Sequence, residues 1–210
     1  MAIRLGEVAP DFVADTTHGT IRFHAWKAGK WAVLFSHPRD FTPVCTTELG
    51  AVAGLKEEFD RRGVKVIGLS VDPLESHLEW EKDIGEVTGN EMNFPVIADP
   101  DRKLAVMYDM IHPAASETAT VRSVFVIDPA NVVRLTMTYP SSTGRNFKEI
   151  LRVIDALQLA DRKPIATPAD WQPGDDVIVA LSVSDEEAAQ VFPEGFEAKK
   201  PYLRLVKQPA

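Results

Sequence analysis

The stretch that decides the fold is residues 31–45, WAVLFSHPRDFTPVC. Residues 31–36 are apolar and rich in aromatic and branched side chains, which is typical of a strand buried on both faces of a sheet. The residues that follow contain two prolines, a threonine and Cys45, the only cysteine in the sequence of 210 residues. A thiol directly after a buried strand is either core filler or a working nucleophile, and the rest of the sequence separates these two interpretations.

The sequence after this stretch alternates between helical and strand-like patterns. A helix is expected over 45–62, ending at Gly63, and a second helix over 74–87. DPAN, at 128–131, favours a hairpin because Asp, Pro and Asn are turn formers. Further strands are expected at 64–71, 123–127 and 132–139. The alternation predicts an α/β fold, with a mixed central sheet inside a three-layer core.

The C-terminal part of the chain has a different composition. The strongest helical pattern places apolar side chains at 147, 150, 151, 154 and 157. Prolines and acidic residues then dominate 161–176, which indicates an extended linker to a small terminal unit. Such a unit is too small to be stable alone. We therefore expect two domains, 1–160 and 161–210.

Charge and hydropathy exclude several classes of protein. The formal net charge is -8, from 23 basic and 31 acidic residues, which argues against a nucleic-acid partner because that binding needs clustered cations. No apolar stretch approaches the ~18 residues of a membrane span, and the first residues lack the pattern of a signal peptide. We expect a cytoplasmic protein with no membrane span.

The cysteine and histidine content argues against disulfides and metals. A single cysteine excludes an intrachain disulfide, and the five histidines show no metal-ligand spacing. We expect no metal and no cofactor. Apart from His24 and His37, the histidines are interpreted as solvated or structural: His18, His77 and His112.

The expected helix start gives Cys45 a polar environment. Unpaired N–H groups and the helix dipole favour a thiolate in the first helical turn. A thiolate that forms more easily is also a weaker nucleophile, so catalysis depends on groups that orient the electrophile. The Thr42 hydroxyl and the N–H groups of Val44 and Cys45 are candidate donors, while Pro38 and Pro43 shape the pocket without adding donors. This pattern suits attack on an oxygen.

These residues resemble a known family. Pro38, Thr42 and Cys45 reproduce the P-x-x-x-T-x-x-C motif of the peroxiredoxins, and SHPRDFTPVCTTEL is similar to the one-cysteine, peroxiredoxin 6-like branch. Further blocks look like the same branch, so that the resemblance covers nearly the whole chain: FPVIADPDRKLA, VRSVFVID, YPSSTGRNFKEILRVIDALQL and ATPADW.

The resemblance implies a thioredoxin-like fold and a thiol-dependent peroxidase. Hydrogen peroxide and organic hydroperoxides would be reduced through a sulfenic acid on Cys45, in antioxidant defence and redox homeostasis. Thr42 would hold the peroxide and Pro38 would shield the sulfenate. Arg122 matches the family arginine that holds the thiolate and the leaving oxygen.

Three further residues are expected to support the site. Glu48 would orient Arg122, Arg145 is a candidate second cation, and His37 is a candidate for the pocket wall. Each assignment has a structural alternative: an N-cap for Thr42, a sheet-edge ion pair for Arg122, a partner of the helix dipole for Glu48 and packing for His37.

The absence of a second cysteine implies an external thiol reductant, either glutathione or a thioredoxin-like protein. The family also suggests a homodimer or a larger homo-oligomer, with the 132–139 strand pairing at an edge and the segment after Asp161 reaching the partner.

Two other hypotheses remain: a cysteine-dependent hydrolase in which a histidine is the base, and a binding or chaperone-like oligomer in which Cys45 is incidental.

Overall fold

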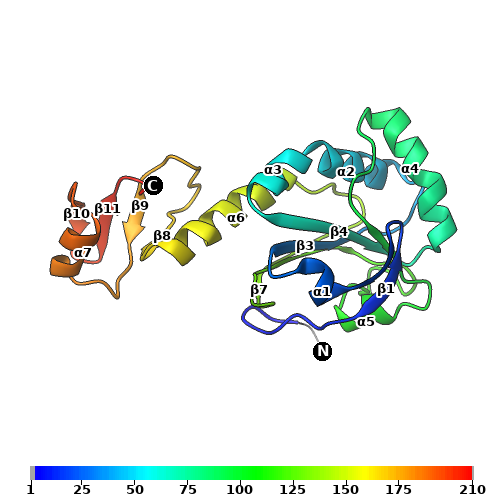
Figure 1. The fold of residues 1–210 in the computed structure, drawn as a ribbon, viewed down its shortest axis with the longest axis horizontal. Helices are drawn as coiled ribbons and strands as arrows, with labels where there is room; N and C mark the ends of the chain where they lie inside the picture. The colour runs from blue at the N-terminus through cyan, green and yellow to red at the C-terminus, as the bar shows by residue number, and fades with distance from the viewer. Residues whose placement is uncertain (1–2, 210) are drawn as a thin grey trace. The chain divides into compact units, whose positions relative to one another are not determined.

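The chain divides into two compact units, residues 1–147 and 148–210, in the computed structural model, which describes residues 3–209 (Figure 1). The sequence had placed the boundary after residue 160. Helix α6 (Phe147–Arg162) lies almost entirely in the second compact unit, where Leu159 belongs to the apolar core.

Within the described residues, the first unit is built on a seven-stranded sheet in the order β2-β1-β5-β4-β3-β6-β7. The pairs β3/β4 and β4/β5 are parallel, and the remaining neighbours are antiparallel. The predicted mixed sheet is therefore confirmed. Its strands are β1 (Val13–Thr16), β2 (Gly19–Arg22), β3 (Trp31–Ser36), β4 (Val64–Ser70), β5 (Val96–Ala98), β6 (Arg122–Ile127) and β7 (Val133–Tyr139).

Helices cover both faces of this sheet, which confirms the predicted three-layer core. Figure 1 shows α2, α3 and α4 on one face and α1 and α5 on the other. On the second face, Phe23 and Leu104 pack with Leu34 of β3 and Ile67 of β4 in one apolar cluster. The helices are α1 (Phe23–Lys27), α2 (Pro43–Gly54), α3 (Lys56–Arg61), α4 (Leu74–Thr88) and α5 (Lys103–Met107).

The long strands follow the sequence prediction closely. All six residues of β3 are buried, as the apolar run at 31–35 predicts, and the polar Ser36 is buried with them. The predicted hairpin joins β6 to β7, and its turn closes with a hydrogen bond from Asp128 N to Val132 O of 2.9 Å. Asn131 has a φ of +67°, a left-handed conformation that Asn tolerates better than most residues.

The single helix expected over 45–62 is wrong in two respects. It begins earlier, at Pro43, where the ring fixes φ and the missing N–H costs nothing. It is also broken at Leu55 into α2 and α3, because the Leu55 N–H bonds to Val52 O three residues back, at 3.0 Å. Gly63 has a φ of +65° and follows the end of α3, as predicted.

The second unit has its own sheet and core. Its strands pair in the order β10-β11-β9-β8, and the segment expected to be an extended linker supplies the short strand β8. Trp171, in the same segment, is buried in the apolar cluster of this unit. The elements after α6 are β8 (Ile165–Ala166), β9 (Val177–Val179), α7 (Asp185–Val191), β10 (Glu197–Lys200) and β11 (Leu203–Val206). No helix among the described residues is long and apolar enough to cross a membrane.

Candidate active site

The turn between β3 and α2 delivers Cys45 to the site. Phe41, in this turn, has a φ of +52°, a sparsely populated conformation for a bulky residue. Thr42 is then extended, and α2 starts at the next residue. Cys45 lies in the first helical turn, as predicted, and its side chain is fully buried.

Arg122 supplies the positive charge that faces the sulfur. Its Nη1 lies 3.3 Å from Cys45 Sγ and also donates to Glu48 Oε2 at 2.6 Å. Its Nε and Nη2 donate to the carbonyl oxygen of Ser141 at 3.1 and 2.7 Å. The guanidinium is therefore held by a carboxylate on one side and a carbonyl on the other, with one nitrogen facing Cys45. This fork geometry requires arginine rather than lysine.

Glu48 is shared between two buried arginines. Its Oε1 accepts hydrogen bonds from the Arg145 backbone N–H at 2.7 Å and from Arg145 Nε at 2.8 Å. Its Oε2 accepts from Arg145 Nη2 at 2.7 Å and from Arg122 Nη1. Burial opposes ionisation of Glu48, but the hydrogen bonds and charge of Arg145, with the charge of Arg122, lower its pKa below the ordinary value.

The charges of this cluster do not balance without the sulfur. Arg122 and Arg145 contribute two positive charges and Glu48 one negative charge, so that the three side chains carry a net charge of +1. An anion at Cys45 would neutralise the cluster, and buried charges are stable when paired. The arrangement therefore suits an anionic group held beside Arg122.

The other predicted site residues lie around the same turn. The Thr42 hydroxyl donates to Arg39 O at 2.8 Å, so it neither caps α2 nor bonds to the sulfur in this state. Its oxygen keeps lone pairs that can accept. The N–H groups of Val44 and Cys45 belong to the first helical turn, where no intrahelical acceptor exists. Pro38 is half-buried in the preceding loop.

Arg145 and His37 have neighbours that the sequence did not indicate. Arg145, expected as a second cation, donates hydrogen bonds to Glu48 and to the Ser123 carbonyl oxygen rather than to the sulfur. Arg122 does form an ion pair, but on an inner strand, since β6 lies between β3 and β7. His37 is fully buried and bonds to Asp40 through Nε2 at 2.8 Å.

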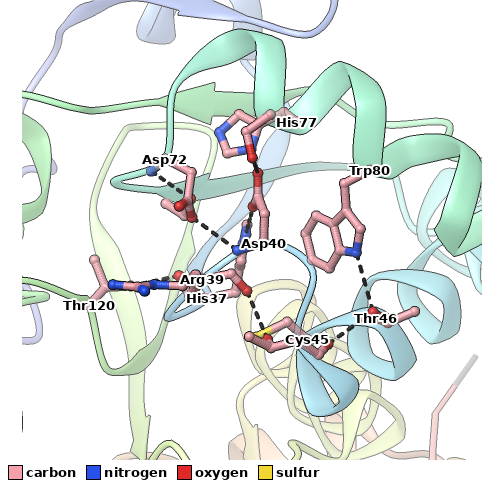
Figure 2. A network of polar contacts seen from close by, with 12 residues as sticks. His37, Arg39, Asp40, Cys45, Thr46, Asp72, His77, Trp80 and Thr120 are labelled. Carbon is pink, nitrogen blue, oxygen red and sulfur yellow. Dashed lines mark hydrogen bonds and ion pairs between the residues drawn. The ribbon is translucent and has the colours of Figure 1, made fainter.

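Asp40 and His77 are the polar residues that the sequence analysis missed (Figure 2). His77 is 1% exposed, and its Nδ1 lies 2.6 Å from Asp40 Oδ2. One donor atom from each of His37, Asp40 and His77 lies within 4.8 Å of the others, although the sequence showed no such spacing. Hydrogen bonds within the trio account for these contacts without an ion. The sequence signal that could have found them is the parallel pairing of β3 and β4. The loops that follow these strands, which begin near His37 and Asp72, start at the same edge of the sheet.

Comparisons with known proteins agree with this geometry. The AhpC/TSA family matches residues 5–136, and the C-terminal domain of 1-Cys peroxiredoxin matches 156–195. The chain is 51% identical to a 1-Cys peroxiredoxin of Dictyostelium discoideum, over 99% of this chain and 86% of that protein. It is 49% identical to Peroxiredoxin-6 of Homo sapiens, over 98% of this chain and 97% of that protein.

Two solved structures are similar along the whole chain. The C45S mutant of peroxiredoxin 6 from Arenicola marina is 51% identical, covers 99% of both chains and has a TM-score of 0.94. A yeast mitochondrial 1-Cys peroxiredoxin, studied for thiol resolving via glutathione/thioredoxin systems, is 52% identical, covers 98% of this chain and 99% of that chain, and has a TM-score of 0.92.

The thioredoxin-like core and the single-cysteine site together define a thiol-dependent peroxidase, an antioxidant oxidoreductase. The chain belongs to the 1-Cys peroxiredoxins, in the peroxiredoxin 6-like branch. The expected fold class, with a second small sheet in the C-terminal domain, is thereby confirmed.

Proposed function

We propose that Cys45 is the peroxidatic nucleophile of this enzyme. The observation that carries the proposal is the 3.3 Å contact between Cys45 Sγ and Arg122 Nη1 inside a buried cluster of net positive charge. The thiolate attacks the terminal oxygen of the hydroperoxide, the S–O bond forms as the O–O bond breaks, and the leaving oxygen takes a proton to give water or an alcohol. Sulfur is oxidised by two electrons to a sulfenic acid.

The neighbouring residues receive roles from their positions. Thr42 accepts a hydrogen bond from the hydroperoxide, and the N–H groups of Val44 and Cys45 donate to its oxygens, so that the O–O bond is held in line with the sulfur. Arg122 stabilises the charge that develops on the leaving oxygen. Pro38, half-buried beside the turn, shields the product from water.

Glu48, Arg145 and His37 support this chemistry from outside the reacting atoms. Glu48 orients Arg122 through the 2.6 Å contact, and Arg145 orients Glu48 through three hydrogen bonds. His37 belongs to the wall of the site. No metal and no cofactor takes part, because the sulfur itself supplies both electrons.

Return of the sulfenic acid to the thiol requires an external thiol, since the chain has no second cysteine. Glutathione or a thioredoxin-like protein is the proposed reductant, supported by the glutathione/thioredoxin systems described for the yeast relative. The first thiol forms a mixed disulfide with Cys45 and releases water, and a second thiol then releases Cys45.

We place the peroxidase chemistry in a domain of residues 1–160 and assign 161–210 to a small C-terminal peroxiredoxin domain. The family matches at 5–136 and 156–195 support this division. A homodimer, or a larger homo-oligomer, is the proposed assembly. Strand β7 supports it, since β7 is an outer strand of the sheet among the described residues, and such an edge needs covering.

We propose a cytoplasmic location, because the cytosol keeps single cysteines reduced. One relative, Peroxiredoxin PRX1 of Saccharomyces cerevisiae, is mitochondrial, and that compartment is the alternative. Fractionation of cells that express the protein with a small epitope distinguishes the two compartments.

Graded oxidation followed by intact mass spectrometry tests the proposed reaction. One equivalent of hydrogen peroxide should add about 16 Da and remove the free thiol, and excess peroxide should add about 32 or 48 Da because no resolving cysteine protects the sulfenic acid. A dimedone adduct, mapped by peptide digestion, should fall on Cys45. Loss of peroxide with no mass added to the Cys45 peptide would contradict the proposal.

Arg122→Lys should lower the second-order rate constant for hydrogen peroxide by about 10²-fold. Lysine keeps the charge but presents one nitrogen, which cannot span Cys45, Glu48 and the Ser141 carbonyl oxygen, and loss of one aligned donor typically has an effect of this size. Stopped-flow fluorescence measures the rate. Arg134→Lys, on the neighbouring strand β7, is the matched control and should leave the rate unchanged. Equal rates for the two variants would remove Arg122 from the mechanism.

The hydrolase alternative is not favoured by the geometry. A cysteine hydrolase needs a histidine base within hydrogen-bond reach of the sulfur. Among residues 3–209, the hydrogen bond to Cys45 Sγ comes from Arg122, and no ring nitrogen of His37 or His77 bonds to the sulfur.

A further inference from the structure

The Asp40 carboxylate is buried between two histidines (Figure 2). His37 Nε2 lies 2.8 Å from Oδ1, and His77 Nδ1 lies 2.6 Å from Oδ2. The Ser76 hydroxyl also donates to Oδ2, at 2.8 Å. Burial favours the neutral acid, but the hydrogen bonds from the two histidines hold the pKa of Asp40 well below its usual range. The carboxylate is therefore ionised in the folded protein.

The hydrogen bonds of His77 fix its protonation state. Its Nε2 lies 3.1 Å from the Ile97 carbonyl oxygen, and its Nδ1 faces Asp40. A carbonyl oxygen and an ionised carboxylate can only accept hydrogen bonds, so both ring nitrogens must donate. His77 is then an imidazolium, and it neutralises Asp40 within the protein interior.

His37 is left with one proton, at a defined nitrogen. Its Nε2 faces Asp40 and must donate, while its Nδ1 is buried without a hydrogen-bond partner among the described residues. Burial lowers the pKa of His37 by more than the hydrogen bond and charge of Asp40 raise it, and the charge of His77 lowers it further. The ring is therefore neutral, with an unprotonated Nδ1.

Two chains of contacts connect His37 to the cysteine site. Its ring centroid is 5.2 Å from that of Trp80, whose Nε1 donates to Oγ1 of Thr46, the neighbour of Cys45. The His37 carbonyl oxygen accepts from Thr120 Oγ1 at 2.8 Å, two residues before Arg122. The charged groups that face His37 are Asp40 in its own loop, Asp72 after β4 and His77 on α4.

We propose that Asp40 and His77 are positioning residues for the reduction of hydrogen peroxide: the neutral pair locks His37 in its Nε2–H form, so that the unprotonated Nδ1 accepts a hydrogen bond from one O–H of hydrogen peroxide while Thr42 accepts from the other. The proposal rests on the function proposed above for Cys45. A protonated Nδ1 would be a donor, and would compete with the donors at Arg122 and at the start of α2 for the same oxygens.

Nitrogen NMR of the reduced wild-type protein tests the lock without any activity measurement. With ¹⁵N-labelled histidine at pH 7, His37 should carry one proton, on Nε2, and His77 should carry two. Spectra of His37→Gln and His77→Gln assign the signals. A proton on His37 Nδ1, or a singly protonated His77, would overturn the inference even if Cys45 reduces peroxide normally. The predicted pattern in a protein inactive towards peroxide would overturn the proposed function alone.

A rescue experiment tests the effect on the reaction. His77→Gln removes the cation but leaves the Asp40 charge, which raises the pKa of His37. The ratio of the peroxide rate at pH 6 to that at pH 8 should fall about tenfold relative to wild type, within the range for one acid–base group.

Adding Asp40→Asn to His77→Gln should restore the ratio to within about twofold of wild type. The amide oxygen of the new asparagine accepts from His37 Nε2–H, its amide nitrogen donates to the introduced glutamine, and no unpaired charge remains. His112→Gln, a histidine away from the cluster, is the control and should match wild type. If the double variant is as impaired as His77→Gln, or more so, the trio has only a packing role and the proposal fails.

Discussion

Replacing Cys45 with serine is expected to abolish turnover of peroxide with every thiol reductant. A serine hydroxyl is not ionised at neutral pH, and its oxygen cannot take up a second oxygen to give an acid that thiols reduce. The chain contains no other cysteine that could substitute. The five methionines consume peroxide only slowly and stoichiometrically, because thiols do not return their sulfoxides without a reductase.

The measurement follows peroxide in the presence of dithiothreitol, glutathione and a thioredoxin system, with wild type and Cys45→Ser side by side. Serine is nearly the size of cysteine, so circular dichroism and the unfolding midpoint should change little. Alkylation of wild-type protein with iodoacetamide blocks the Cys45 thiol and should abolish turnover in the same way. Sustained turnover by either blocked protein would refute Cys45 as the nucleophile and would revive the hypothesis that this cysteine is incidental.

Strands β3, β4 and β6 were predictable because burial on both faces gives a nearly continuous run of apolar residues. The expected range of β3 matches the structure, and those of β4, β6 and β7 differ by one residue at one end. Strands β2 and β8, each at one end of a sheet, were not predicted. Strand β2 is largely exposed, and β8 has only two residues, so neither carries an apolar period. Their existence depends on pairing with neighbours rather than on their own sequence.

The site was predictable only where residues are close in sequence or belong to a motif. Cys45 and Glu48 lie one helical turn apart, which a helix pattern can show. The contact of Arg122 with Cys45 joins β6 to α2, and only the family resemblance indicated it before the structure was known. The contact between Asp40 and His77 was not predicted because the two residues lie on different elements, and each side chain alone is of a type that is commonly exposed to solvent. The carboxyl ends of two parallel strands bring them together.

Replacing Glu48 with glutamine is expected to lower the free energy of unfolding by about 3–5 kcal/mol at pH 7. Glu48 is 3% exposed, and each of its oxygens accepts two hydrogen bonds. An amide nitrogen in either position would face two donors from Arg122 or Arg145, and two buried cations would lose their counter-charge. Such a loss is a large fraction of the 5–15 kcal/mol typical of folded domains.

The chain offers a matched control on its surface. Glu58 also joins two arginines, Arg61 and Arg62, but its side chain is 39% exposed. Water can replace the lost interactions there, so Glu58→Gln should change the unfolding free energy by about 0–1 kcal/mol. Urea unfolding followed by tryptophan fluorescence measures both variants under the same conditions. Equal effects for the two substitutions would mean that burial adds nothing to the Glu48 cluster.

The difference in unfolding free energy between wild type and Glu48→Gln has an expected dependence on pH. Because the folded-state pKa of Glu48 lies below its unfolded value of about 4.3, its stabilisation is fully present above that value and is lost as the pH falls through the folded-state pKa. Glu48→Gln has no such group to protonate. The difference between wild type and variant should therefore be constant from pH 8 to pH 6 and shrink towards pH 3. A difference that grows on acidification would reverse the sign of the linkage, and would mean that the neutral acid, rather than the carboxylate, holds Arg122 and Arg145 in place.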